Sequence, residues 1–177
     1  MEGNKLYSIH ARKGNKEINT KITFTFLPLL VLQGSFGYDY AQGSMSLYSS
    51  DATEPTISLI KAKWRGGSTN TADKHKRNYK IKTLNEKGKS QDISLLGMRE
   101  DNNWILDAGQ VDLFRLRNRI ATEIWNDFAT KPYYTSKEPK AKSGVAGKVV
   151  EVILNNEYRC SSSPKWTRKM IINYIYF

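Results

Sequence analysis

KAKWRGGSTNTADKHKRNYKIK, residues 61–82, joins two strand-like ends through a connection rich in glycine, hydroxyl and cationic side chains. Between residues 61 and 89, ten Lys and Arg residues stand against Asp73 and Glu86, so ten minus two gives this block +8 of the chain's net +11. The ten cations are at positions 61, 63, 65, 74, 76, 77, 80, 82, 87 and 89. Charge concentrated in this way favours an anionic partner, and a glycine-rich connection lets backbone amides approach phosphate.

The composition is that of a globular chain. With 177 residues, of which 39% are hydrophobic, the chain is long enough for one domain or for one lobe of a larger domain. Cys160 is the single cysteine and the two histidines, His10 and His75, are far apart. The sequence therefore predicts neither an internal disulfide nor a zinc site built from Cys and His.

The two ends differ from the middle. Residues 1–22 are polar and show no strand or helix period, so we expect an irregular leader there. No signal peptide is recognisable in it, and the localisation is left open. The longest apolar run, residues 26–32, is far shorter than the roughly 20 residues of a membrane helix. Apolar alternation stops at Cys160, so we expect residues 160–177 to form a divergent tail.

The middle of the chain predicts a sheet and one helix. Apolar residues recur with the helical period over 112–128, and Asp112 is a suitable N-cap. Residues 95–106 are expected to form a loop-rich connection with apolar anchors. Strands are predicted at residues 23–32, 44–48, 56–64, 78–84 and 149–154, with a partner strand from 157 after the Asn155-Asn156 turn. The fold class predicted is α+β, an antiparallel sheet packed on one main helix.

The connection after residue 64 is a candidate phosphate-binding turn. Its adjacent glycines let amides approach an anion, and its hydroxyls can donate to phosphate oxygens. The candidate residues are Arg65, Gly66, Gly67, Ser68 and Thr69. An ordinary polar turn between antiparallel strands explains the same residues, because glycine-rich turns are common.

Lys80 and Lys82 are the second candidate, since both lie on one face of the strand 78–84 and Tyr79 lies on the other. These lysines could bind phosphate, or they could protect an exposed strand edge from pairing. On the helix, Arg119 and Glu123 are four residues apart and could form a surface ion pair. Alternatively, Glu123 could reach a strand lysine and hold it toward nucleotide phosphates, as a helix glutamate does in kinases.

The order of these segments resembles the spore coat protein H (CotH) kinase family, in the form found in Bacteroidetes-like bacteria. The resemblance covers about residues 27–159, within a half-domain taken as 23–159. It rests on KAKWRGGSTN (61–70), KRNYKIK (76–82), LLGMREDNNWILDAGQVDLFRLRNRIATEIWNDFA (95–129) and VVEVILNNEYR (149–159).

The resemblance implies an atypical protein kinase, related distantly to the protein-kinase fold, that binds ATP with Mg or Mn and phosphorylates serine on a protein substrate. It implies that this chain is the nucleotide-binding, N-lobe-like half, truncated before the catalytic acids. The family pattern does not continue after Arg159, so the resemblance also implies a frameshift or an early stop at that point. WRGGST (64–69) would lie near phosphate, Lys80 or Lys82 would contact the nucleotide, and Glu123 would be the helix partner. By itself the chain is expected to be inactive, with no catalytic or metal-binding residue assigned.

Two other functions stay open. A small basic nucleic-acid-binding domain would use the cationic strand face, with Tyr79 and Trp64 available for base stacking. A surface module without enzymatic activity is the other alternative.

Overall fold

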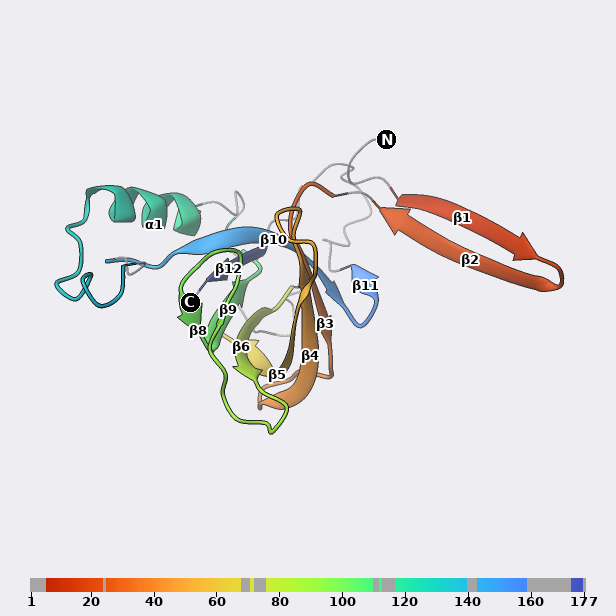
Figure 1. The fold of residues 1–177 in the computed structure, drawn as a ribbon, viewed down its shortest axis with the longest axis horizontal. Helices are drawn as coiled ribbons and strands as arrows, with labels where there is room; N and C mark the ends of the chain where they lie inside the picture. Colours follow the sequence, from red (N-terminus) through yellow and green to blue (C-terminus); the bar gives the residue numbers. More distant parts are fainter. Residues whose placement is uncertain are drawn as a thin grey trace.

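The computed structural model describes residues 6–23, 25–67, 71, 76–109, 112, 117–139, 143–158 and 173–176. It is mostly sheet with one helix among the described residues, which confirms the fold class in coarse terms (Figure 1). The elements are β1 (Leu6–Lys13), β2 (Lys16–Thr23), β3 (Leu29–Gln33), β4 (Ala41–Tyr48), β5 (Thr56–Arg65), β6 (Asn78–Leu84), β7 (Ile93–Ser94), β8 (Glu100–Asp101), β9 (Asn103–Asp107), α1 (Arg117–Phe128), β10 (Gly147–Leu154), β11 (Glu157–Tyr158) and β12 (Asn173–Tyr176).

The main sheet curls until its two sides meet. Its strand order is β11, β10, β12, β9, β6, β5, β4, β3, and β3 pairs in addition with β10. This last pairing is parallel, whereas the other ladders of the sheet are antiparallel. The predicted antiparallel sheet is therefore corrected to a mixed one. β3 and β10 are far apart in sequence, so no tight turn forces them to run in opposite directions.

The interior of this curled sheet is the hydrophobic core. Alternate residues of each strand point inward, as the twofold period of a strand requires. Trp104, Ile81 and Ile60 are 0% exposed. The core cluster consists of Leu30, Leu32, Phe36, Met45, Leu47, Ile60, Ala62, Ile81, Leu95, Met98, Trp104, Leu106, Val150, Val152 and Leu154.

β9 is a strand that the sequence analysis missed, because residues 95–106 were expected to be loop-rich. Trp104 and Leu106 are buried in the core, while Asn103, Ile105 and Asp107 are only half-buried. The segment NWILD therefore alternates as a strand should. Its five residues were too short for that pattern to stand out.

The helix α1 has an apolar face, yet none of its residues is buried. Asn126 holds α1 to the segment before β10. Its side chain donates to Val145 O at 2.8 Å and accepts from Gly144 N at 3.0 Å. The Asp112 carboxylate accepts a hydrogen bond from the backbone amide of Arg117, the first residue of α1, at 2.9 Å. An N-cap accepts from the amide two or three residues on, whereas Arg117 is five residues from Asp112, so the N-cap stays a prediction. Residues 113–116 of the predicted helix lie outside the described residues.

Residues 6–23 form a hairpin, which corrects the expectation of an irregular leader for residues 6–22. Residues 1–5 lie outside the described part of the chain. β1 and β2 pair in an unbroken antiparallel register from Leu6↔Thr23 to Lys13↔Lys16. Figure 1 shows this hairpin projecting away from the curled sheet. The turn at Gly14 has a φ of 62°, a left-handed conformation in which glycine has no steric penalty.

The far end of the chain contributes a strand to the sheet. β12 lies between β9 and β10 and pairs with both of them. The rest of residues 159–177 lies outside the described part of the chain. The predicted Asn155-Asn156 turn is confirmed, with φ values of 50° and 65° that suit a tight hairpin. As for the membrane, α1 is not long and apolar enough to cross one, nor is any other helix in the described residues.

Candidate functional site

Four lysines line the outer face of β5 and β6. Lys61 is paired with Lys82 and Lys63 with Lys80 in the antiparallel register. Directly opposite residues share a face, and that face is the reverse of the one that buries Ala62 and Ile81. All four residues are half-buried, which is typical of lysines whose alkyl stems cover apolar surface. We call these four residues the lysine face.

Tyr40, just before β4, lies among these ammonium groups. Its ring centroid is 5.0 Å from Lys63 Nζ and 5.8 Å from both Lys61 Nζ and Lys82 Nζ. Such distances are within the range of cation–π attraction. Burial raises the pKa of Tyr40 above its usual value, so its phenol is neutral at neutral pH.

The lysine face has no carboxylate partner in the described part of the chain. No ion pair or hydrogen bond joins any of the four lysines to another described residue. Their cross-strand neighbours Gln42 and Asn103 are polar and uncharged. Four like charges held close together raise the local potential and attract an anion.

The alternative of a protected strand edge is wrong for Lys80 and Lys82. β6 lies between β5 and β9, with ladders on both sides. A strand inside a sheet has no free edge that its lysines could protect. Edge protection therefore does not explain these two lysines, and their binding of phosphate stays a prediction.

The predicted phosphate turn begins where β5 ends. Arg65 is the last residue of β5 and its cross-strand partner is Asn78, which puts it in line with Lys61 and Lys63. Gly66 has a φ of 103° and Gly67 is exposed. Such a backbone conformation strongly favours glycine. Ser68 and Thr69, the other two predicted residues of this turn, lie outside the described residues.

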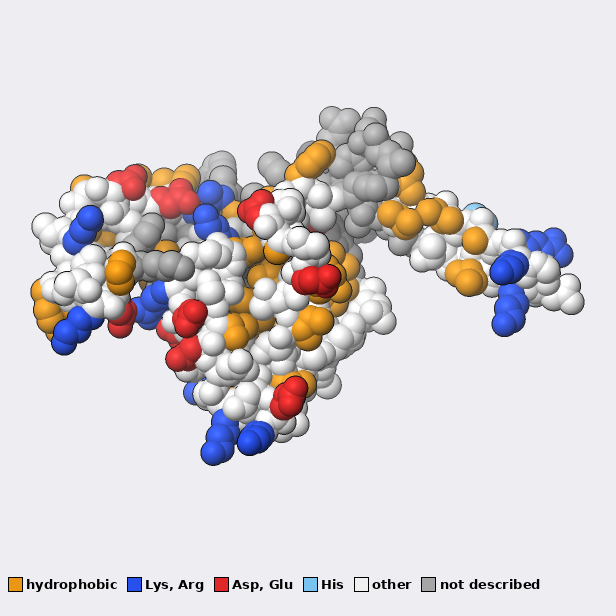
Figure 2. Space-filling view, in the orientation of Figure 1, with side chains coloured by type: hydrophobic (Ala, Val, Ile, Leu, Met, Phe, Trp, Pro, Cys, Tyr) orange, Lys and Arg blue, Asp and Glu red, His pale blue; other side chains and the backbone are white. Residues whose placement is uncertain are grey.

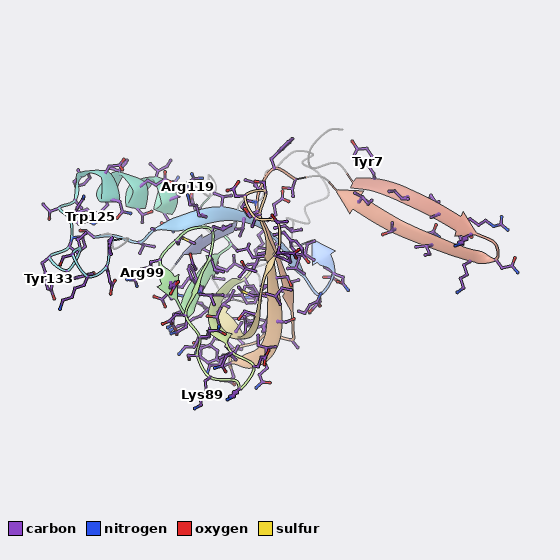
Figure 3. The ribbon with its side chains drawn as sticks, in the orientation of Figure 1. Tyr7, Lys89, Arg99, Arg119, Trp125 and Tyr133 are labelled. Carbon is purple, nitrogen blue, oxygen red and sulfur yellow. The ribbon has the colours of Figure 1, made fainter. Side chains whose placement is uncertain are left out.

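Glu123 does not contact the lysine face. Its carboxylate accepts a hydrogen bond from Arg119 Nε at 2.7 Å, and both side chains are well exposed. No ion pair joins Glu123 to Lys80 or Lys82 among the described residues. Figure 3 shows Arg119 on α1, in the upper part of the view. The surface-pair interpretation of Arg119 and Glu123 is confirmed.

The structure thus brings Arg65, Lys80 and Lys82 onto one face and leaves Glu123 apart. Lys61, Lys63 and Tyr40 belong to the same surface but were not predicted. The alternation in KAKWR could have identified the two lysines. Nothing in the sequence could have identified Tyr40, because its position depends on how β4 pairs with β5.

Trp64 and Tyr79, the residues proposed to stack on bases, lie on the opposite face. Trp64 is paired with Tyr79, and the two side chains lie on the same face as the buried pair Ala62 and Ile81. Tyr38 packs edge-on against Trp64 at 5.0 Å between ring centroids, and Arg77 lies 4.8 Å from the Trp64 ring centroid. Neither ring belongs to the lysine face, so the basis given for the nucleic-acid alternative is corrected.

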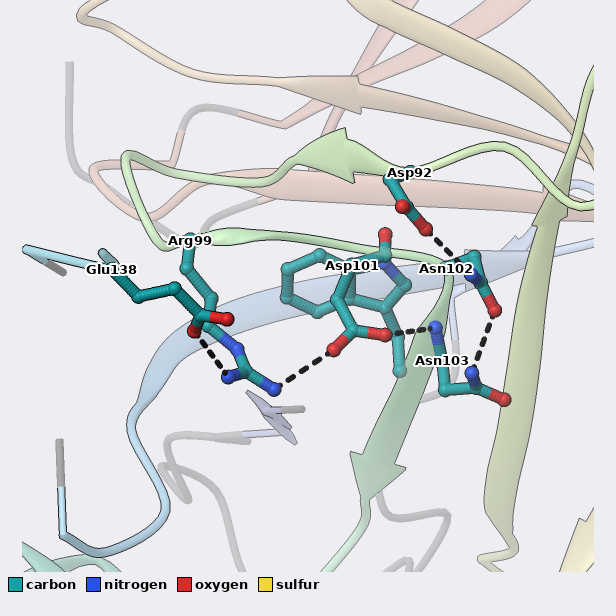
Figure 4. Close-up of polar contacts among 7 residues, drawn as sticks. Asp92, Arg99, Asp101, Asn102, Asn103 and Glu138 are labelled. Atoms are coloured by element: carbon teal, nitrogen blue, oxygen red, sulfur yellow. Dashed lines mark hydrogen bonds and ion pairs between the residues drawn. The ribbon is translucent and has the colours of Figure 1, made fainter. Parts of the chain in front are cut away.

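A second polar cluster lies between β8 and the loop after α1 (Figure 4). Arg99 contacts Asp101 at 3.0 Å and Glu138 at 3.5 Å. Asp101 also accepts the Asn103 amide at 2.8 Å. The Arg99–Glu138 ion pair connects the 131–139 loop to the segment just before β8. In the described residues, no three His, Cys, Asp or Glu side chains are grouped to hold a metal ion.

Comparison with known families identifies one match. The model of the family described as CotH kinase protein matches residues 62–159, a segment that runs from β5 to β11 and includes Lys63, Lys80 and Lys82. Neither the curated proteins nor the solved structures gave a match. The matched segment covers more than half of the chain, so this chain belongs to the CotH kinase protein family.

Proposed function

We propose that this chain is the nucleotide-binding, N-lobe-like part of a CotH-family kinase and that it binds ATP on the lysine face. The observation that carries the proposal is the group of four lysines without a carboxylate partner among the described residues. A triphosphate is a compact polyanion that several ammonium groups can contact at once. Each lysine would serve as a point charge for phosphate oxygens.

Tyr40 gives this surface an aromatic component beside the cations. Tyr40 is 38% exposed, so a planar ligand could reach part of it. An adenine base could stack there while the phosphates extend toward Lys80 and Lys82. Arg65, Gly66 and Gly67 would flank the phosphates at the end of β5. Ser68 and Thr69 stay predictions from the sequence.

The proposal assigns nucleotide binding to this chain, but neither metal binding by its own side chains nor catalysis. Mg²⁺ or Mn²⁺ would arrive with the nucleotide, because the described residues offer no cluster of donor side chains for the ion. Phosphoryl transfer needs held metal ions and a positioned nucleophile. We therefore expect no incorporation of labelled phosphate when the purified chain is incubated with ATP and either metal.

Thermal unfolding with and without Mg·ATP tests the proposal. Ligand at a hundred times its dissociation constant stabilises a folded protein by about 2.7 kcal/mol. The double variant Lys80→Ala, Lys82→Ala should lose this stabilisation. The matched control Lys87→Ala, Lys89→Ala removes the same charge from exposed positions in the turn after β6, and it should keep the stabilisation.

The control also separates the alternatives. If both double variants lose the stabilisation by Mg·ATP equally, ATP binding depends only on net charge, and the proposed site is refuted. Tight binding of single-stranded oligonucleotides that falls steeply with salt and is not competed by ATP would favour the nucleic-acid function. No response to either ligand would favour a surface module without enzymatic activity.

A further inference from the structure

The β1–β2 hairpin presents two chemically different faces. Tyr7, Ile9 and Ala11 share one face with Ile18 and Ile22, because the register pairs Tyr7 with Ile22 and Ala11 with Ile18. The other face carries Ser8, His10, Arg12, Glu17 and Asn19. On it, His10 Nδ1 is hydrogen-bonded to Asn19 Oδ1, and Arg12 stands opposite Glu17. The hairpin therefore has one apolar face and one polar face.

The apolar face is exposed. Ile9, Ile18 and Ile22 are 40%, 64% and 38% exposed. Figure 2 shows hydrophobic side chains along the hairpin and blue side chains near its far end. A two-stranded hairpin that stands alone is marginally stable in water. This face therefore has apolar surface to bury on a partner.

Two lysines lie on the apolar face, next to the turn of the hairpin. Lys13 and Lys16 are paired across the turn, and the alternation along each strand puts them on the side of Ile9, Ala11 and Ile18. Residues 6–23 contain Arg12, Lys13, Lys16 and Lys21 against Glu17, so four minus one gives a net charge of +3. A partner must accept isoleucines and ammonium groups on one surface.

We propose that this face binds the surface of an anionic lipid bilayer. The isoleucine side chains would enter the boundary between headgroups and acyl chains, and the lysines at the tip would contact lipid phosphates. A second copy of the hairpin fits less well. Stacking two such faces would place Lys13 and Lys16 against either the partner's lysines or its apolar side chains, without an acidic group to compensate.

Co-sedimentation of the full chain with vesicles tests this proposal. The chain should bind vesicles of phosphatidylcholine mixed with phosphatidylserine and should bind phosphatidylcholine vesicles weakly. Ile18→Ser should weaken binding about tenfold, because it removes an apolar side chain from the inserted face. Its matched control is Ile57→Ser on β5, where Ile57 is 70% exposed. That variant should bind as the unaltered chain does.

A second pair of variants tests the cations without touching the apolar side chains. Lys13→Ser, Lys16→Ser should weaken binding by about fivefold for each lysine removed. Lys87→Ser, Lys89→Ser removes the same charge elsewhere and should have a smaller effect. Equal losses in both charge variants would overturn the proposal. So would failure to bind mixed vesicles, or a dimer in solution that Ile18→Ser dissociates.

Discussion

The curled sheet and the helix α1 carry similar amphipathic patterns but use them differently. In β6, Ile81 is fully buried on the inner face, while Lys80 and Lys82 occupy the outer face. In α1, Ile120, Ile124, Trp125 and Phe128 form an apolar face, yet each is at least half exposed. An amphipathic sequence specifies which side chains share a face. Burial of that face depends on the strands or helices available to cover it.

Substituting one isoleucine in each region gives the largest expected contrast. Ile81→Ala should lower the free energy of unfolding by about 2 to 5 kcal/mol, because it leaves a cavity in the core. Ile124→Ala removes the same atoms from an exposed position and should change the free energy of unfolding by about 0.5 kcal/mol or less. Urea unfolding of the two variants measures both values. A comparable loss for Ile124→Ala would show that the helix face is buried in solution.

The closure of the sheet provides a smaller contrast. The Asn155 side chain accepts from Gly34 N at 2.9 Å and donates to Gly34 O at 3.0 Å, which ties the end of β10 to the end of β3. Among the described residues, the Asn156 side chain makes one hydrogen bond, which it accepts from Gln33 Nε2 at 3.1 Å. Both residues have positive φ, so alanine costs a similar backbone penalty at each.

Asn155→Ala should therefore be less stable than Asn156→Ala by about 1 kcal/mol, the value of the additional hydrogen bonding. The same urea measurement applies. If the two variants are equally stable, the side-chain bridge to Gly34 does not hold the β3–β10 closure.

The strands that were predicted well have a strong local signal. β6 was predicted with the bounds that the structure shows, and β5 and β10 were predicted to within two residues. Their side chains alternate between a buried and an outer face, and turn residues mark their ends. The turn at Asn155 and Asn156 was predictable for the same reason, because Asn tolerates positive φ.

The features that were missed depend on long-range pairing. The parallel β3–β10 ladder joins Leu29 to Glu151, and no local pattern encodes such a contact. Tyr40 reaches the lysine face only because β4 lies beside β5. The hairpin β1–β2 was missed because its apolar residues are diluted by polar ones, so a cross-strand stripe appears only when both strands are aligned.

The partner of Glu123 is the point where the family resemblance and the local geometry give different expectations. The resemblance implies a pair with a strand lysine, whereas the structure pairs Glu123 with Arg119 one helical turn away. An exposed pair of this kind contributes only about 0.3 to 0.5 kcal/mol. Glu123 could therefore be released from Arg119 at small cost if a nucleotide offered a better arrangement.

Glu123→Gln and Arg119→Gln distinguish these two roles. If the structure describes the working arrangement, each variant should lower the free energy of unfolding by about 0.5 kcal/mol or less. Each should also keep the full stabilisation by Mg·ATP that depends on Lys80 and Lys82. Thermal unfolding with and without Mg·ATP measures both quantities. Loss of the ATP response in Glu123→Gln but not in Arg119→Gln would contradict this expectation, because only a contact between Glu123 and the nucleotide site separates the two variants.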